Sequence, residues 1–309
     1  MDAVAFAELV EFGNAQRNVT YLLVASLALA MVDALHMLPD EVALIWAADW
    51  NVGKVLYLCC RYLVFVDLIP GLIYYMSRTL SVTQCQRIFA PGSILTLSGV
   101  VLAEALLYLR VYALSAGSRA VGISLGILFL GLHGAAYGFL VKFIQSLEYV
   151  PSPIPTLISC LQIKGESGRL EVVFILVLCS ELVCLVLTLW ILFTKYKGSK
   201  SPFVSMFYRD GLGYFLLLSA ITLGNIICQL VAPPGYTVLL ANPQLVLHSI
   251  LATRMVLHIR GLILSGRGQG SSGAMELSSI GYAANVNLQV EASPEIPKAP
   301  GRLGGRTSH

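Results

Sequence analysis

The stretch "EVVFILVLCSELVCLVLTLWILF", residues 171–193, contains only two charged side chains, Glu171 and Glu181. A helix needs about 20 predominantly apolar residues to cross the hydrocarbon core of a bilayer. This stretch is long enough, and inside lipid its backbone N–H and C=O groups can be satisfied only within a helix. It therefore predicts a transmembrane helix that carries one ionisable residue, Glu181, near its middle.

Six further stretches have the same apolar character, and together they predict the fold class. Only 12% of the 309 residues are charged, whereas about a quarter are charged in an average soluble domain. In addition to 171–193, we predict transmembrane helices at 19–38, 54–76, 92–114, 121–145, 211–232 and 238–258. The sequence therefore predicts an all-α membrane protein, with a seven-transmembrane helix bundle over residues 19–258 and the lipid bilayer as its surroundings.

Basic residues in the connecting loops indicate how the bundle is oriented. Seven spans place the two termini on opposite sides, and Lys and Arg are more frequent in cytoplasmic loops. The strongest basic cluster is "KYKGSK", residues 195–200, between the fifth and sixth spans. We therefore predict that residues 1–18 lie outside and residues 259–309 inside, with the plasma membrane as the expected location. The net charge of +3 is too small to indicate a nucleic-acid partner, and we expect none.

The C-terminal segment changes composition after the last predicted span. The stretches "GRGQGSSG", residues 266–273, and "PEIPKAPGRLGG", residues 294–305, are rich in Gly, Ser and Pro. Such segments cannot bury enough apolar surface to offset the conformational entropy that is lost on ordering. We therefore predict that the cytoplasmic tail is disordered from about residue 265.

Two of the seven cysteines lie in predicted connections on the same side of the membrane. Cys85 precedes the third span, and Cys160 lies between the fourth and fifth spans. In the predicted orientation both face the outside, where disulfides persist. We therefore predict a Cys85–Cys160 disulfide; the alternative is two unrelated thiols.

The stretch "HMLPDEVALIW", residues 36–46, connects the first two spans on the predicted inner face. Pro39 can occupy the first turn of a new helix, and Asp40 and Glu41 would then face the positive end of its dipole. Trp46 is of the type that prefers the headgroup level of a membrane. We therefore predict a short interfacial helix that turns the chain back into the second span. The alternative is that the two acids dock a cytoplasmic signalling partner.

These residues begin a longer pattern that resembles a known family. The pattern consists of "LPDEVALIW" at 38–46, Trp50, Gly53-Lys54 and "RYLVFVD" at 61–67. It is similar to the N-terminal domain, of unknown function, of a large basidiomycete fungal membrane family. Later signatures of such proteins are resembled by "EALLYLRVYAL" at 104–114, "PFVSMFYRDG" at 202–211 and "HSILATRMVLHIR" at 248–260. The resemblance implies a multi-pass, predominantly seven-helix protein, and it implies no established activity or cofactor.

Ionisable and polar residues inside the spans are candidate site residues, because each is costly in lipid unless it faces the bundle interior. Counting about 1.5 Å of rise per residue, Asp33 and Arg61 lie at similar depth on adjacent helices near the inner surface. We predict that they form an ion pair. A second group falls close to the midplane on separate helices and predicts a polar layer: Asp67, Glu104, Glu181, His248 and Asn225. The layer serves either as a ligand, ion or proton site or as a set of interhelical hydrogen bonds.

These observations favour a receptor-like protein with a polar site inside the bundle, which would bind a small-molecule ligand and a cytoplasmic signalling partner. The alternatives are an ion- or proton-coupled transporter or channel, and a non-catalytic membrane scaffold. The sequence "LRVYAL", 109–114, places Leu109 where many seven-helix receptors have an acid before the arginine. We find no catalytic motif, and no two histidines are four residues apart on one helix. We therefore expect no enzymatic activity, no metal ligands and no cofactor.

Overall fold

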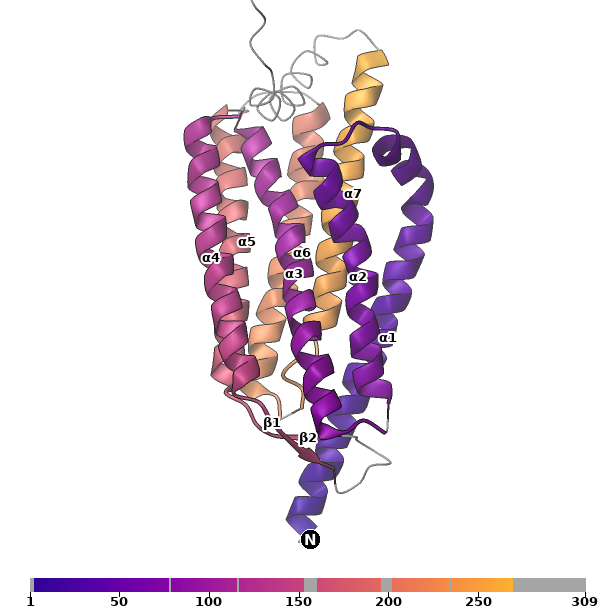
Figure 1. Ribbon diagram of the computed structural model, residues 1–309. Helices are drawn as coiled ribbons and strands as arrows, with labels where there is room; N and C mark the ends of the chain where they lie inside the picture. Colours follow the sequence, from indigo (N-terminus) through magenta and orange to yellow (C-terminus); the bar gives the residue numbers. More distant parts are fainter. Residues whose placement is uncertain are drawn as a thin grey trace, which may run out of the picture.

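The computed structural model describes residues 3–77, 79–115, 117–152, 160–195, 202–233 and 235–268; for 3–9, 195, 202–212 and 262–268 it describes the backbone alone. Within these residues the chain forms seven long α-helices that lie side by side in one bundle, with a β-hairpin at one end (Figure 1). The prediction of a mostly helical protein with seven helices is confirmed.

The helices match the predicted apolar runs and extend beyond most of them, although α6 ends one residue before its predicted end at 232 and α7 begins three residues after its predicted start at 238. Their bounds are α1 Ala3–Glu41, α2 Val52–Met76, α3 Val82–Leu114, α4 Arg119–Gln145, α5 Ser167–Lys195, α6 Pro202–Val231 and α7 Ala241–Gly268. A π-helical turn, η1 (Val42–Trp46), follows α1, and the strands β1 (Glu148–Pro151) and β2 (Cys160–Lys164) form the hairpin between α4 and α5.

Six of the described helices, α1 to α6, are long and apolar enough to cross a membrane. The chain is therefore a multi-pass membrane protein. The helix α7, predicted as the seventh span, is less apolar because it carries residues such as Gln244, His248 and Thr253, all of which are buried. It packs against α1, α2, α3 and α6. Its neighbours thus shield its polar groups. That α7 also crosses the membrane is part of the proposed function.

The distribution of side chains is the reverse of that in a soluble bundle. Large apolar residues face outward, and Leu130 of α4 is 72% exposed and Trp190 of α5 is 64% exposed. Carboxylates face inward, and Glu104 and Glu181 are completely or almost completely buried. This arrangement suits hydrocarbon surroundings, in which apolar side chains need no cover and polar groups must find partners within the bundle.

The two ends of the chain extend further as helix than predicted. The helix α1 begins at Ala3, so most of the predicted outer segment 1–18 is helical. The helix α7 continues to Gly268, past both the predicted end of the span at 258 and the predicted start of disorder at 265. The first turns of α1 and the last turns of α7 lie at opposite ends of the bundle (Figure 1). The rest of the predicted tail lies outside the described residues.

A disulfide joins the hairpin to the start of α3. The strands pair in antiparallel register, with Tyr149 opposite Gln162. Cys160 at the start of β2 is bonded to Cys85 in the first turns of α3, where Ser81 and Gln84 form a capping box. The predicted Cys85–Cys160 disulfide is confirmed, and it holds the hairpin beside the end of the bundle.

The prediction that Pro39 begins a separate interfacial helix is wrong. Pro39 lies inside the last turn of α1, which continues to Glu41 and then widens into η1. In this wider turn each backbone hydrogen bond spans five residues instead of the four of the α-helix. Trp46 at the end of η1 is 58% exposed, as is expected at a membrane surface.

Candidate functional site

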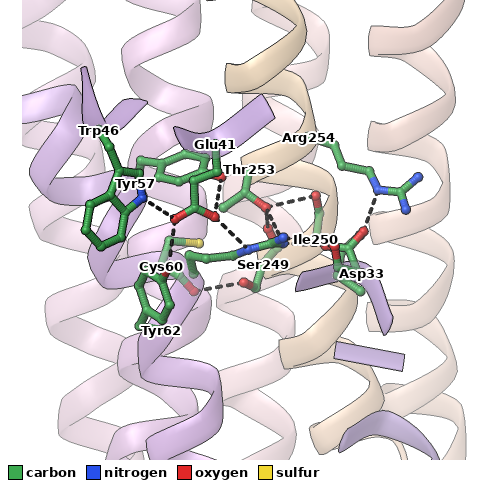
Figure 2. A network of polar contacts seen from close by, with 11 residues as sticks. Asp33, Glu41, Trp46, Tyr57, Cys60, Tyr62, Ser249, Ile250, Thr253 and Arg254 are labelled. Carbon is green, nitrogen blue, oxygen red and sulfur yellow. Dashed lines mark hydrogen bonds and ion pairs between the residues drawn. The ribbon is translucent and has the colours of Figure 1, made fainter. Parts of the chain in front are cut away.

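Arg61 of α2 lies at the centre of a buried ionic network with Asp33 and Glu41 of α1. Figure 2 shows the two acids together with the other labelled residues of the network. The side chain of Arg61 is only 3% exposed. Nη1 donates to Asp33 Oδ2, and Nη2 donates to the carbonyl oxygen of Asp33 at 3.0 Å. Its Nε lies 3.5 Å from Glu41 Oε2. The structure thus brings together Asp33 and Arg61, and it adds Glu41 as a second acid.

Asp33 has a second basic partner that sequence reasoning missed. Arg254 of α7 donates from Nε to Asp33 Oδ1 at 2.6 Å, as Figure 2 shows. The four charged groups of the network are therefore two carboxylates and two guanidinium groups, and their formal charges cancel. A buried charge that lacks a partner is costly, so the second arginine accounts for how both Asp33 and Glu41 can be buried beside Arg61.

Glu41 is a buried hydrogen-bond acceptor at the end of α1, not a residue at the start of a separate interfacial helix as predicted. Its carboxylate accepts from Trp46 Nε1 at 3.1 Å, from Tyr57 OH at 3.3 Å and from Tyr62 OH at 2.7 Å. The neighbouring Asp40 is exposed. The two adjacent acids therefore have different environments: Asp40 faces outward, and Glu41 joins α1, η1 and α2.

The turn between η1 and α2 is held by a buried lysine. Lys54 donates from Nζ to the carbonyl oxygens of Trp46, at 3.0 Å, and Ala48, at 2.6 Å. The same ammonium group lies 4.7 Å from the centre of the Trp50 ring. Carbonyl oxygens at the end of a helix have no partner within the helix, and a cation is favourable there. The lysine therefore fixes the angle at which the chain re-enters the bundle.

Substitutions of Glu41 and Asp40 should have different effects on stability, because only Glu41 is buried. We expect Glu41→Gln to lower the free energy of unfolding by about 1–3 kcal/mol, because the side chain loses its negative charge and one of its two accepting oxygens becomes an NH₂ donor. Asp40→Asn is the matched control, and its effect should stay below about 1 kcal/mol, the scale of an exposed helix-dipole interaction. The measurement is thermal unfolding of the purified proteins in detergent. Equal, small losses for both variants would contradict the buried role of Glu41.

A second polar cluster lies deeper in the bundle, on α3, α5 and α7. Glu104, Glu181 and His248 each offer a ligand atom, and these atoms all lie within 4.8 Å of one another. His248 Nε2 is 3.1 Å from Glu181 Oε1. On the other side, His133 Nε2 of α4 is 3.3 Å from Glu104 Oε2. Each carboxylate is thus in contact with one histidine.

Hydroxyl and amide groups extend this cluster toward α6. The Ser180 hydroxyl donates to Glu104, and the Thr222 hydroxyl donates to Glu181 Oε1 at 2.7 Å. Gln244 Nε2 donates to Thr222 at 2.9 Å, and Asn225 Nδ2 donates to Gln244 Oε1 at 2.5 Å. Four of the five predicted members of the midplane layer, Glu104, Glu181, His248 and Asn225, therefore belong to one connected set.

Asp67, the fifth predicted member, takes a separate position. Its carboxylate accepts from the Thr96 hydroxyl of α3 at 3.0 and 3.2 Å. Asp67 and Gln244 both line an internal cavity of about 120 Å³ between α2, α3, α4, α5 and α7, which we call the inner cavity. Most of its other walls are apolar or aromatic and include Tyr74, Tyr75, Phe89, Val100, Phe143 and Phe174.

An outer cavity of about 270 Å³ lies next to the inner one, at the hairpin end of the bundle. The two cavities share the wall residues Tyr74, Tyr75, Phe89, Phe143 and Val238. The outer cavity is also lined by Gln162 and Lys164 of β2 and by Phe12 and Gln16 of α1. The disulfide-linked hairpin therefore borders the outer cavity, and the outer cavity adjoins the inner cavity that Asp67 lines.

Sequence reasoning missed several members of these sites, namely His133, Ser180, Thr222, Gln244, Thr96 and Arg254. Each is a polar residue within an apolar run, so its type alone marked it as a candidate. Its partner, however, lies on another helix in most cases. Residue spacing along the chain says nothing about such contacts, which depend on how the helices are rotated against each other.

Comparison with known proteins identifies one part of the chain. Residues 21–66 match a family of unknown function, DUF6533. No curated protein matches the sequence. The DUF6533 segment contains Asp33, Glu41, Lys54 and Arg61, so it holds all of the ionic network except the residues that α7 contributes. The matched segment is thus a structural unit, α1–η1–α2, that is fastened together by its own polar side chains.

Proposed function

We propose that this protein is a receptor-like seven-helix membrane protein of the plasma membrane, with its N-terminus outside, that binds a small molecule in the inner cavity. The observation that carries the proposal is a largely apolar and aromatic cavity with one carboxylate, Asp67, beside a hairpin that is held by a disulfide. Ligand sites commonly combine apolar walls with a few placed polar groups. Disulfides persist outside the cytoplasm, so this end of the bundle would receive the ligand.

The course of α7 supports a receptor-like role. Gln244 of α7 lines the inner cavity, His248 contacts Glu181 one turn further on, and Arg254 binds Asp33 in the ionic network. A ligand in the cavity would therefore press on the same helix that takes part in the network at the opposite end. Coupling between distant sites requires an element that contacts both of them, and α7 does so.

The proposed orientation gives a prediction about accessibility. An epitope tag before Met1 should be labelled on intact cells, whereas a tag after His309 should be labelled only after permeabilisation. The physical reason is that seven crossings separate the termini, and that basic residues around Lys195 are retained on the cytoplasmic side. Labelling of both tags on the same side would contradict the seven crossings, and labelling of the C-terminal tag alone on intact cells would contradict the orientation.

The ligand proposal is tested by binding to purified protein. A predominantly apolar molecule with one amine or hydroxyl group fits the cavity, because Asp67 can accept a hydrogen bond from that group. Compounds of this class would be screened by thermal shift. Each compound that raises the melting temperature of the natural protein should bind Asp67→Asn at least about tenfold more weakly, because a charge-assisted hydrogen bond is lost.

A second variant fills the cavity without altering a polar group. Gly92 lines the inner cavity, and a Cβ at this position would meet Pro70 Cβ at 3.7 Å, an ordinary contact. Gly92→Leu should therefore fold and should block the compounds sterically. Asp40→Asn, which changes an exposed acid, is the matched control for Asp67→Asn and should bind normally. Compounds that bind Asp67→Asn and Gly92→Leu as tightly as the natural protein would overturn the proposed site.

Ion- or proton-coupled transport is the second candidate function. It is supported by the contacts of Glu104 with His133 and of Glu181 with His248 inside the bundle, because buried acid and histidine groups are typical of proton and ion pathways. Flux across liposomes that contain the purified protein separates the two candidates. A receptor should show no flux that depends on Glu181, and a transporter should lose its flux in Glu181→Gln. A non-catalytic scaffold would show neither ligand binding nor flux.

We also propose that the whole chain belongs to the basidiomycete fungal membrane family that it resembles. The DUF6533 segment covers the second half of α1, η1 and most of α2. The later stretches that are similar to basidiomycete fungal membrane proteins lie on α3, α6 and α7. Because such proteins have no established activity, the cytoplasmic signalling partner is proposed from the orientation of the bundle. The exposed Trp46 and Trp50 lie at the end of the bundle where such a partner would bind.

A further inference from the structure

Several buried side chains in the middle of the bundle have polar atoms that lack hydrogen-bond partners within the part of the chain that the structure describes. Among these atoms are Glu104 Oε1, Glu181 Oε2, His133 Nε2, Asn225 Oδ1 and both ring nitrogens of His248. His248 Nε2 lies 3.1 Å from Glu181 Oε1, but not in hydrogen-bond geometry. Glu104 is 1% exposed, and Glu181 and His248 are completely buried. A buried polar atom that makes no hydrogen bond is costly, and it needs an explanation such as a bound ion or water.

The remaining oxygens of the two carboxylates are held by neighbouring groups. Ser180 donates to Glu104 Oε2, and Thr222, which accepts from Gln244, donates to Glu181 Oε1. Each carboxylate therefore has one oxygen that is oriented by a hydroxyl and one oxygen without a partner. Ligands of bound metal ions are usually oriented by such outer hydrogen bonds. The cluster has this arrangement on both of its acids.

The charges of the cluster favour a cation. Each carboxylate makes its described charge contact with a histidine, Glu104 with His133 and Glu181 with His248. Buried carboxylates need positive charge or hydrogen-bond donors beside them. One divalent cation between Glu104 and Glu181 would supply positive charge to both.

We propose that Glu104, Glu181 and His248 bind a divalent metal ion, with Zn²⁺ as the best match. Imidazole nitrogen together with carboxylate oxygen suits Zn²⁺, whereas Mg²⁺ and Ca²⁺ favour oxygen ligands alone. Tetrahedral zinc separates its ligand atoms by roughly 3.5 Å. The three ligand atoms lie within 4.8 Å of one another, so small side-chain rotations bring them to one ion. Water would complete the coordination.

The wall of the inner cavity is linked to the cluster. Gln244 lines the inner cavity and donates a hydrogen bond to Thr222, which in turn donates one to Glu181. The cluster is therefore joined to the cavity wall through two hydrogen bonds. The metal site is distinct from the proposed ligand site at Asp67, and it does not depend on the receptor-like function.

The test measures zinc binding by full-length protein that is purified without a histidine tag and freed of metal by chelation. Equilibrium dialysis with Zn²⁺ should show saturable uptake of about one ion per chain, and zinc should raise the melting temperature. X-ray absorption at the zinc edge should show nitrogen and oxygen ligands that include one imidazole. Absence of saturable uptake, or a spectrum without imidazole, would overturn the proposal whether or not any variant folds.

Variants assign the ion to the cluster. Glu181→Gln and His248→Asn should lose the saturable uptake and the zinc-dependent rise in melting temperature. Thr222→Val, which removes only the hydroxyl that orients Glu181, should bind zinc about 10–100-fold more weakly. The matched controls are Glu148→Gln and His36→Asn, because both residues are exposed and would reveal adventitious surface binding. Undiminished uptake in Glu181→Gln and His248→Asn, or equal loss in the controls, would overturn the assignment.

Discussion

Arg61→Met is expected to destabilise the protein by about 3–5 kcal/mol, because removing one partner of a buried ion pair leaves the other charge without compensation. Arg61 is 3% exposed and contacts Asp33 and Glu41, which are 2% and 1% exposed. Arg254→Met is the matched control. Arg254 also binds Asp33, but its side chain is 41% exposed. Because Arg254 is partly exposed, its charge is better screened than that of Arg61, so its loss should cost clearly less than the loss of Arg61.

A double-mutant cycle shows whether the loss comes from the contact itself. Asp33→Leu should be about as severe as Arg61→Met, because it leaves two arginines without their shared acid. The double variant Arg61→Met/Asp33→Leu should be milder than the sum of the single changes. Glu41 would remain in the double variant, but it keeps the hydrogen bonds from Trp46, Tyr57 and Tyr62. The measurement is the thermal unfolding of the natural protein and its variants in detergent. Strictly additive losses, or equal losses for Arg61→Met and Arg254→Met, would contradict the network.

Loss of the Cys85–Cys160 disulfide is expected to lower stability by about 2–4 kcal/mol, because the bond restricts the unfolded chain. The two cysteines are 75 residues apart in sequence, and the closed loop contains most of α3, all of α4 and β1. The double variant Cys85→Ser/Cys160→Ser avoids a leftover thiol. Cys59→Ser is the control, because Cys59 is a free, exposed cysteine and its replacement should change the melting temperature little.

The disulfide can also be detected directly by chemical analysis. Peptide mapping of unreduced natural protein should recover Cys85 and Cys160 in one linked pair of peptides. A reducing agent should lower the melting temperature of the natural protein to that of the double variant, and it should leave the double variant unchanged. Free alkylation of both cysteines in unreduced protein would contradict the disulfide.

The first part of the chain shows how far local reasoning reaches. The depths of Asp33 and Arg61 follow from counting residues along two apolar runs, and the structure places these side chains in contact. The same reasoning treated Glu41 as an exposed neighbour of Asp40, but Glu41 is buried. The two acids are adjacent in sequence and both lie near Pro39, so local composition does not separate them. Their difference arises from Tyr57 and Tyr62, which only the packing of α2 against α1 brings near Glu41.

The central cluster shows what reasoning along single helices does not predict. Polar residue type and depth predicted a layer near the midplane, and four of its members are connected in the structure. The absence of paired histidines on one helix argued against a metal site. That argument considers only ligands on a single helix, whereas Glu104, Glu181 and His248 come from three helices. Asp67 was predicted for the same layer because its depth is similar, but it faces the inner cavity and Thr96 instead.

The sequence by itself determined that the chain is a helical membrane protein, because hydropathy is a local property and lipid permits few backbone structures. It also determined which polar residues lie inside the spans, and it indicated the cysteine pair through the side of the membrane that both cysteines share. Only the tertiary structure decided that Arg254 binds Asp33, that Glu41 is buried and that Glu104, Glu181 and His248 come together from three helices. Counting residues gives the height of a side chain along its helix, but the direction in which it points is set by the rotation and packing of all seven helices together.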